Sequence, residues 1–326
     1  MAIASEVAKT RPELEISFVS YADGATAFKR AGFSVIDLKL SATNPYIDTL
    51  VLSRQIISDH KPDLIVSHEE FAALPAARIA KLPSIFISAW LPDPRSGITH
   101  ESLLSASSII LLGQPGIFAL PQELATKPLY VGEIIRKFQF TTSDRSAIRA
   151  EMKIPDDVVL LLMVPGAHNR EVETPTAHLI FEAFKLLQQN KKMLLWIGDK
   201  DYEFIKSCSA NVPGVHAVRY VDPIEKLFAA SDVVITKGTR GTTLDVSSMG
   251  LPSISLSFGK NPIDDILVPR VRTNIALNAA AVTPDILVEY IRNILVSPKP
   301  VPVPPTGVEK VTNALISEID RCLRTR

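Results

Sequence analysis

The chain has 326 residues, which at ~150 residues per domain predicts two domains. Its 35 lysines and arginines balance its 35 aspartates and glutamates, and this net charge of zero argues against a chain-wide cationic surface for nucleic acid or anionic membranes. Because 46% of the residues are hydrophobic and 21% are charged, the chain can form hydrophobic cores, and bulk disorder is excluded.

The sequence shows no sign of a secreted or membrane-spanning protein. Cys208 and Cys322 are its two cysteines, too few and too far apart for a disulfide framework or a zinc cluster. The densest apolar run, Val158–Val164, is far shorter than the ~18 residues of a membrane helix. Glu6 and Lys9 interrupt any signal-peptide core. We therefore predict a soluble, cytoplasmic protein with no transmembrane segment.

Short apolar runs alternate with helix-length segments along the whole chain. The predicted strands are Glu15–Ser20, Ser34–Leu38, Asp63–Ser67, Ser84–Ala89, Ser108–Gly113 and Pro128–Gly132, followed by Val158–Val164, Met193–Gly198, Val215–Tyr220, Val233–Thr236 and Ser253–Ser257. Most are continuously apolar, which is typical of parallel strands covered on both faces. The alternation predicts an α/β fold with two Rossmann-like, doubly wound domains.

Composition shifts suggest how the chain is divided. The predicted first domain is 1–135 and the predicted second domain is 136–307. A polar stretch with a helix at Ser143–Met152 connects them. The proline-rich run Ser297–Pro305 is typical of a stiff, extended linker. An amphipathic helix of about Val308–Leu323 follows it.

The chain opens with a predicted helix instead of a strand. Ile3, Ala4, Val7 and Ala8 form one apolar face of this helix. A doubly wound domain normally begins with a strand that becomes central in the sheet. Without that strand two ladders would stay unpaired, at ~1 kcal/mol or more for each buried unsatisfied group. We expect that the true start lies upstream of Met1; the alternative is an unusual repair of the sheet.

One strand–loop–helix segment carries a possible anion site. The strand Val233–Thr236 leads through the Gly/Thr loop Lys237–Thr242 into a predicted helix, Thr243–Met249. Backbone N–H groups and threonine hydroxyls at a helix N-terminus favour an anion, and Lys237 adds a positive charge. Asp245 lies within reach of a sugar hydroxyl pair. The alternative is an ordinary turn in which glycine only permits the bend.

This segment resembles the donor-binding motif of GT-B fold glycosyltransferases. The resemblance is greatest to family 28 and the group of the lipid-linked peptidoglycan N-acetylglucosaminyltransferase. It implies that Asp245 binds the donor ribose. It places Thr239, Arg240, Gly241 and Thr242 on the loop that faces the donor diphosphate.

Further segments match the same family in order along the chain. The other residues that the resemblance assigns to the donor are Val221 for the nucleobase, Asp264 and Asp265 for the sugar, and Gly166 and His168 for the diphosphate. Pro128–Arg136 resembles the family's last strand of the first domain. The C-terminal helix, 308–326, is similar to the helix that packs back on that domain.

The family's catalytic loop has no counterpart in this sequence. In the family, a first strand and a Gly-rich loop that commonly ends in Gly-His precede the helix found here at Ala2–Thr10. We therefore look for a base at His68, Glu69 and Glu70, which follow a predicted strand on the ligand-binding side of an α/β sheet. The alternative is a solvated loop. Asp93 and His100 are weaker candidates.

Other cofactor signatures are absent from the sequence. No group of His, Asp and Glu has metal-ligand spacing, and there is no dinucleotide fingerprint, Walker loop or Gly-x-Ser-x-Gly elbow. The resemblance implies a metal-independent enzyme that needs no cofactor, because helix N-termini carry the charge of the diphosphate.

The predicted function is inverting transfer of a sugar from a nucleotide sugar, UDP-linked by resemblance, to an unknown acceptor held by the first domain across a cleft. One alternative is a UDP-sugar hydrolase or epimerase with the same architecture. Another is a non-catalytic nucleotide-sugar-binding or partner-completed subunit. We expect no nucleic-acid partner; peripheral membrane contact and homo-oligomer formation are left open.

Overall fold

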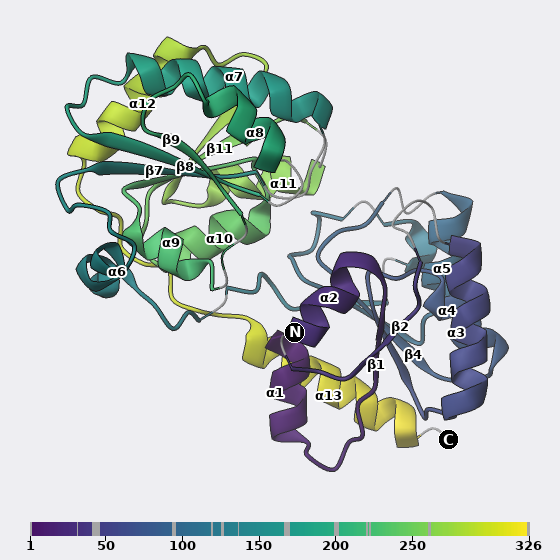
Figure 1. The fold of residues 1–326 in the computed structure, drawn as a ribbon. Helices are drawn as coiled ribbons and strands as arrows, with labels where there is room; N and C mark the ends of the chain where they lie inside the picture. The colour runs from purple at the N-terminus through teal and green to yellow at the C-terminus, as the bar shows by residue number, and fades with distance from the viewer. Residues whose placement is uncertain are drawn as a thin grey trace. The chain divides into compact units, whose positions relative to one another are not determined.

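The computed structural model describes residues 2–30, 32–40, 46–92, 96–118, 120–124, 127–135, 137–165, 170–198, 202–219, 221, 223–259 and 262–324. The chain folds into two compact units (Figure 1). The first comprises Met1–Ile134 and Thr306–Arg326, and the second comprises Ile135–Pro305. Within the described residues, no helix is long and apolar enough to cross a bilayer.

A four-stranded parallel sheet forms the centre of the first unit. Its strands, in spatial order, are β3 (Ile65–His68), β4 (Ser84–Ser88), β5 (Ser108–Leu111) and β6 (Pro128–Tyr130). Every residue of β4 and β5 is buried, as their continuous apolar sequences predict. The helices between these strands are α3 (Tyr46–His60), α4 (Ala73–Ile79) and α5 (Gly97–Ser105), and the short 3₁₀ helix η1 spans Gln122–Leu124.

The two ends of the described chain pack together on this sheet. Helix α1 (Ala2–Thr10) lies beside α13 (Val308–Arg324), as Figure 1 shows. Val7 of α1 and Leu315 of α13 share one buried cluster with Ile87 of β4 and Ile110 of β5. Arg11, just after α1, donates to Asp320 of α13 at 2.7 Å. The C-terminal helix therefore forms part of the first unit's core.

The remaining two strands of the first unit form a separate sheet. Parallel strands β1 (Phe18–Ser20) and β2 (Val35–Asp37) pair only with each other and are covered by α2 (Ala22–Arg30). Their small core is aromatic, with the Phe18 ring 4.8 Å from Phe28 and 4.7 Å from Phe33. The break between β1 and β3 agrees with the prediction that the first domain lacks a strand.

The edges on either side of this break are exposed. Val19, in the middle of β1, is 41% exposed, and Val66, in the middle of β3, is 45% exposed. On β3, the N–H groups of Ile65 and Glu69 donate to carbonyls on the β4 side. Because alternate residues of a strand bond to opposite neighbours, Val66 directs its backbone groups away from β4, toward the open edge.

The second unit is built on a six-stranded parallel sheet. Its strands, in spatial order, are β12 (Asn274–Asn278), β11 (Ser253–Ser257), β10 (Val233–Thr236), β7 (Val159–Val164), β8 (Lys192–Ile197) and β9 (Val215–Val218). The helices are α6 (Arg145–Glu151), α7 (Arg170–Leu186), α8 (Tyr202–Ser209), α9 (Glu225–Ala230), α10 (Arg240–Ser248), α11 (Pro262–Leu267) and α12 (Pro284–Val296), with 3₁₀ turns η2 (Thr142–Asp144) and η3 (Val268–Arg270).

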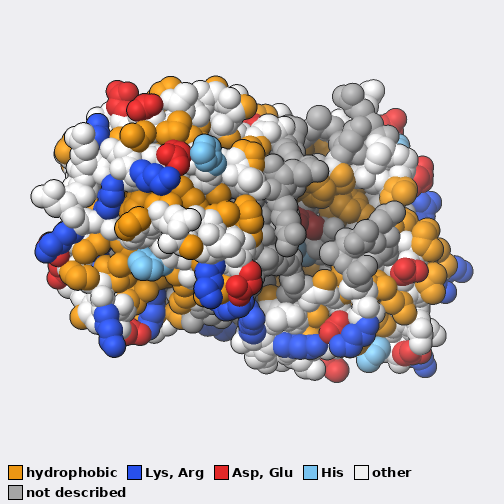
Figure 2. Space-filling view, turned by 45° about the horizontal axis from the view of Figure 1, so that its top comes forward, with side chains coloured by type: hydrophobic (Ala, Val, Ile, Leu, Met, Phe, Trp, Pro, Cys, Tyr) orange, Lys and Arg blue, Asp and Glu red, His pale blue; other side chains and the backbone are white. Residues whose placement is uncertain are grey.

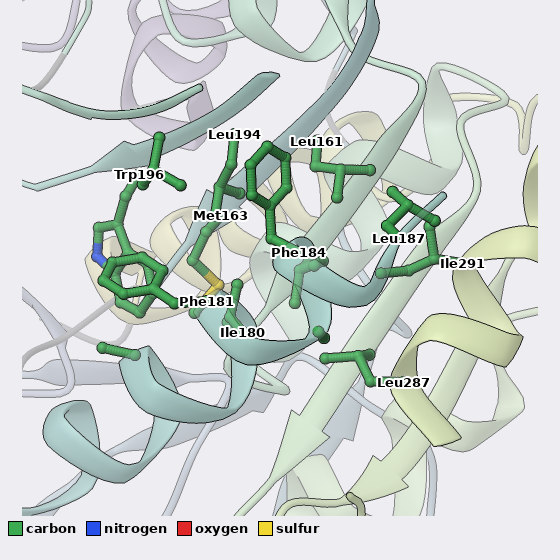
Figure 3. Packing of buried hydrophobic residues seen from close by; sticks show 14 of the residues in the cluster. Leu161, Met163, Ile180, Phe181, Phe184, Leu187, Leu194, Trp196, Leu287 and Ile291 are labelled. Atoms are coloured by element: carbon green, nitrogen blue, oxygen red, sulfur yellow. The ribbon is translucent and has the colours of Figure 1, made fainter. Parts of the chain in front are cut away.

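Helices cover both faces of this sheet, so the unit is doubly wound as predicted. On one face α7 and α12 pack against the strands (Figure 1). Figure 3 shows Phe181 and Phe184 of α7 against Met163 of β7 and Trp196 of β8. On the other face, a second cluster joins α6, α9 and α10 to the sheet.

Two features of this unit differ from the sequence predictions. Strand β12 was not predicted, because its residues are half-buried or exposed and lack a continuous apolar run. Helix α10 begins at Arg240, one turn earlier than the predicted Thr243. Thr239 has the extended backbone of an N-cap, and Thr243 N donates to Thr239 O at 3.1 Å, which closes a first turn despite the weak helix formers Gly241 and Thr242.

A buried ionic cluster anchors α6 at the amino ends of the strands. The side chain of Arg149 is fully buried and donates to Asp232 at 2.9 Å and to the carbonyl of Ala230 at 2.8 Å. Arg145 donates to the other Asp232 oxygen at 2.6 Å. Asp232 also accepts from the N–H of Leu160 in β7 at 2.8 Å. Burial is the main cause that lowers the pKa of Arg149. The negative charge of Asp232 partly offsets this lowering.

Charged side chains show no segregation by sign on the face in Figure 2, where Lys and Arg alternate with Asp and Glu over the described surface. This distribution agrees with the net charge of zero.

Candidate functional site

The order of strands in the second unit creates a ligand position at β7 and β10. From β7 the chain winds outward through β8 and β9, then returns to β10 on the other side and continues to β11 and β12. Val164, the last residue of β7, pairs with Thr236, the last residue of β10. The loops after these strands therefore begin side by side. Open α/β sheets bind ligands at such a reversal, outside the carboxyl ends of the strands.

The loop after β10 has a defined backbone. Thr236 Oγ1 accepts a hydrogen bond from Gly238 N at 3.2 Å. Gly238 has φ +72°, and a Cβ there would lie 3.2 Å from Leu256 O, so the position strongly favours glycine. Thr239 Oγ1 donates to Thr242 Oγ1 at 3.2 Å and does not cap the helix. A helix N-terminus of this kind favours an anion.

Two charged residues of α10 are buried near this loop. Arg240, at the first helical position, is 8% exposed, and Asp245, in the second turn, is 7% exposed. Gly241, between them, is exposed. Thus the four predicted diphosphate residues, Thr239 to Thr242, lie together at the start of α10. The role of Asp245 in binding ribose stays a prediction.

The loop after β11 brings the predicted sugar residues to the same edge of the sheet. Ser257, the last residue of β11, donates through its hydroxyl to Asp265 in the first turn of α11. The same hydroxyl accepts from Gly259 N at 3.2 Å. Asp264 precedes Asp265 in α11 and is partly exposed. Since β10 and β11 are neighbours, these carboxylates lie one strand away from the α10 loop.

The other predicted donor residues are placed only in part. Val221 is half-buried and packs against the hydrophobic cluster that includes α9 and α10. Gly166 and His168 follow β7 but lie outside the described residues. Their expected place beside the diphosphate stays a prediction.

The three predicted catalytic residues of the first unit have different surroundings. Glu69 has a left-handed backbone, φ +60°, and its carboxylate accepts from Ala89 N at 3.1 Å and Ser88 Oγ at 3.3 Å. Glu70 accepts from Tyr21 Oη at 3.0 Å and from Ala72 N at 3.0 Å. Each carboxylate thus forms a hydrogen bond to the residue that follows another strand, Glu69 to Ala89 after β4 and Glu70 to Tyr21 after β1.

His68 differs from these two carboxylates. It is the last residue of β3 and is exposed, with no hydrogen bond or ion pair to any other described residue. Among the described residues, His68 thus lacks the side-chain hydrogen bonds that Glu69 and Glu70 form. Of the weaker candidates, His100 lies in α5, and Asp93 is outside the described residues.

The sequence analysis missed a set of polar residues behind the α10 loop. The buried hydroxyls of Thr236, Thr243 and Ser255 lie against one another, and Asn274 of β12 accepts from Ser255 at 2.8 Å. One signal was present in the sequence. Ser253-Ile-Ser-Leu-Ser257 places hydroxyls at every second position, which puts them on one face of a strand.

One groove on the described surface lies away from the strand reversal. A shallow groove follows α8 and β9 and includes Tyr202 and His216. It lies at the outer edge of the sheet, with β8 between β9 and β7, so it is remote from the strand reversal. Across the described ranges, no group of three or more His, Cys, Asp or Glu side chains could hold a metal ion.

Comparison with known proteins assigns a family to this region. Residues 176–299 match the family model of the glycosyltransferase family 28 C-terminal domain. The chain is 23% identical over 265 residues to the UDP-N-acetylglucosamine--N-acetylmuramyl-(pentapeptide) pyrophosphoryl-undecaprenol N-acetylglucosamine transferase of Shewanella sp. (strain ANA-3). This alignment spans 79% of the chain and 68% of that relative.

Solved structures share the fold. The UDP-GlcNAc 2-epimerase from Neisseria meningitidis bound to UDP-GlcNAc matches with a TM-score of 0.74 and 15% identity, over 98% of this chain and 96% of that one. Acinetobacter baumannii MurG matches with a TM-score of 0.64 and 12% identity, over 97% and 94%. At such identities these likenesses show the fold alone.

The family match includes α10, its N-terminal loop and the whole of α11, and it excludes Gly166 and His168. Together with the GT-B-type fold, it confirms the resemblance to family 28 that the donor motif indicated. Residues 176–299 are thus similar to the C-terminal domain of glycosyltransferase family 28, in a chain with the GT-B-type α/β fold.

Proposed function

We propose that this chain transfers a sugar from a UDP-linked nucleotide sugar to an acceptor, with inversion at the anomeric carbon. The observation that carries the proposal is the position of the α10 N-terminus, whose N-cap Thr239 makes no side-chain cap, at the strand reversal and inside the family 28 match. It offers N–H groups and a positive helix end to a diphosphate.

In the proposed reaction the acceptor hydroxyl attacks the anomeric carbon as the bond to the diphosphate oxygen breaks. Negative charge then grows on the departing UDP. The N–H groups of Gly241 and Thr242 at the start of α10 would stabilise this leaving group without rearrangement. Asp245 would hold the ribose, and Asp264 and Asp265 would contact the sugar hydroxyls.

The acceptor's proton needs a base, and we assign this role to His68. The exposed imidazole at the end of β3 can take a proton, whereas Glu69 and Glu70 already accept bonds from their neighbours. We expect His68→Gln to lower turnover about a hundredfold or more and to leave UDP binding unchanged. His60→Gln, an exposed histidine at the end of α3, is the control.

The names of the relatives suggest the first donor to test. The Shewanella relative is named as an N-acetylglucosamine transferase that uses UDP-N-acetylglucosamine, and the Neisseria structure contains UDP-GlcNAc. Turnover can be followed as UDP release from this donor with a panel of acceptors, including the lipid-linked muramyl pentapeptide named for the Shewanella relative.

Thermal unfolding with nucleotides tests the donor site directly. UDP, GDP, CDP and dTDP, with NAD as control, would be compared on wild type, Asp245→Ala and Asp285→Ala. Asp285 is an exposed carboxylate in the first turn of α12 and serves as the matched control. A ligand at 100 times its Kd adds about 2.7 kcal/mol to the free energy of unfolding. For a protein of this size, this raises Tm by roughly 5–10 °C.

A UDP-selective shift that persists in Asp285→Ala and disappears in Asp245→Ala would support the proposal. A cooperative melt that no nucleotide shifts would overturn it and favour a non-catalytic or partner-completed subunit. Incubation with UDP-N-acetylglucosamine and no acceptor distinguishes a transferase from a hydrolase or an epimerase. Free sugar or an epimer as the main product would favour the hydrolase or epimerase.

A further inference from the structure

A chain of buried hydroxyl groups connects the α10 loop to the edge strand β12. Thr236 Oγ1 lies 2.9 Å from Ser255 Oγ, and Ser255 Oγ lies 2.8 Å from Asn274 Oδ1. Thr243 Oγ1 lies 3.2 Å from the same Ser255 oxygen. Thr236, Thr243 and Ser255 are fully buried, so water does not compete for these bonds.

The direction of each bond follows from counting protons. Asn274 Nδ2 donates to Val268 O at 3.2 Å, so its Oδ1 faces β11 and can only accept. Ser255 therefore donates to Asn274. Thr236 Oγ1 accepts from Gly238 N and has its own proton for Ser255. The resulting order is Gly238 N–H to Thr236, Thr236 to Ser255, and Ser255 to Asn274.

Ser255 thus contacts both ends of the α10 loop. Thr236 is the last residue of β10, before the loop. Thr243 lies in the first turn of α10, after the loop, and donates to Thr239 O at 2.9 Å. Since Thr243 uses its one proton on Thr239 O and Ser255 uses its one proton on Asn274, the 3.2 Å approach of Thr243 to Ser255 is a packing contact. The Thr236–Ser255 hydrogen bond therefore holds the start of the loop, which includes the glycine at φ +72°, while Thr243 packs against the same oxygen after the helix start.

We infer that Ser255, through Thr236 and Asn274, is a positioning residue that holds the α10 loop in the shape that binds the diphosphate. This inference rests on the proposed function for its ligand. The N–H groups of a loop bind an anion well only if they converge without rearrangement on binding. Neither Ser255 nor Asn274 contacts the nucleotide in this scheme.

Matched variants separate positioning from general stability. Thr236→Val keeps the shape and removes the hydroxyl, whereas Thr236→Ser keeps the hydroxyl and removes a methyl group. Ser255→Ala removes the hydroxyl that accepts from Thr236 and donates to Asn274. Ser253→Ala is the control, because Ser253 Oγ donates to the same Asn274 oxygen at 2.9 Å from two residues before Ser255.

The readouts are UDP affinity by calorimetry and amide hydrogen exchange at Gly238 and Thr239, both well below Tm. We expect Thr236→Val and Ser255→Ala to weaken UDP binding roughly three- to tenfold and to speed exchange at Gly238. Thr236→Ser and Ser253→Ala should stay within about twofold of wild type, although each lowers Tm.

Equal UDP affinity and equal exchange in wild type, Thr236→Val and Ser255→Ala would overturn the inference. If wild type binds no nucleotide, the proposed function fails, and exchange alone decides the inference. Faster exchange at Gly238 in Thr236→Val and Ser255→Ala, but not in Ser253→Ala, would still support positioning. Unchanged exchange would reject it.

Discussion

Tyr21 donates a 3.0 Å hydrogen bond to the carboxylate of Glu70, and this bond connects the two sheets of the first unit. Tyr21 directly follows β1, and Glu70 lies two residues after β3. The two strands do not pair. A pair of long side chains thus spans the break between their carboxyl ends, while Glu70 also binds the N–H of Ala72 before α4.

The Tyr21–Glu70 hydrogen bond should make the free energy of unfolding change with pH in the alkaline range. Burial, followed by the charge and hydrogen bond of Glu70, raises the Tyr21 pKa from about 10 to about 12. Because the folded-state pKa is the higher one, the stabilisation is complete below pH ~10 and is lost as pH rises toward 12. We expect Tyr21→Phe to be less stable than wild type at neutral pH, with a difference that narrows across this range.

Phenolate absorbance during a pH titration checks this directly. The chain has 6 tyrosines, and Tyr130 also has a raised pKa through burial. One late-titrating tyrosine should disappear in Tyr21→Phe. A late step of unchanged amplitude would show that Tyr21 titrates normally.

The split sheet predicts uneven stability within the first unit. None of the residues in β1 and β2 is buried, whereas all of those in β4 and β5 are. Regions with little buried apolar surface open locally at low free-energy cost. We expect peptides covering β1, α2 and β2 to take up deuterium faster than peptides covering β4 and β5. Equal protection would show that the two sheets unfold as one unit.

Two glycines near the start of α10 should respond to alanine in different ways. Gly238→Ala places a methyl group at φ +72° and 3.2 Å from Leu256 O, so we expect it to lower stability by about 1–2 kcal/mol. A Cβ at Gly241 would meet no described atom within 4 Å. Gly241 also lies inside α10, where alanine favours the helix by up to ~1 kcal/mol.

Gly241→Ala should therefore keep or raise Tm, yet weaken UDP binding, because its methyl group would crowd the proposed diphosphate position. Thermal unfolding and calorimetry on both variants measure the two effects. Wild-type UDP affinity in Gly241→Ala would remove this residue from the diphosphate site.

The ionic cluster at the opposite ends of the strands should affect stability alone. Arg149→Met breaks the buried pair with Asp232 and leaves Asp232 and several carbonyls short of a donor, so we expect a loss of about 3–5 kcal/mol. Arg219→Met, which breaks the exposed pair with Glu203, should cost about 0–1 kcal/mol. Chemical denaturation measures both.

UDP affinity well below Tm should be the same in Arg149→Met as in wild type, because the cluster lies at the amino ends of β7 and β10 and the donor loops lie at their carboxyl ends. A tenfold weaker affinity would show that the two ends of the sheet are coupled.

Local sequence patterns were sufficient to predict the class of fold. Continuous apolar runs such as Val158–Val164 can be buried on both faces only as central parallel strands, so these strands were predicted within a few residues. The Gly/Thr loop after Val233–Thr236 was predicted as well, because its turn chemistry is local. Strand β12 was missed because an edge strand needs no apolar run.

The contacts between polar side chains became evident only in the folded chain. Glu69 and Glu70 looked equivalent to His68 in the sequence, but their carboxylates bind neighbours that are distant in the chain. Ser255 and Asn274 are 19 residues apart, and no local pattern pairs them. The pairing of strands determines such contacts, and it also determines the break between β1 and β3. Hydrogen bonds between strands depend on which segments become neighbours in space, and not on propensity along the chain.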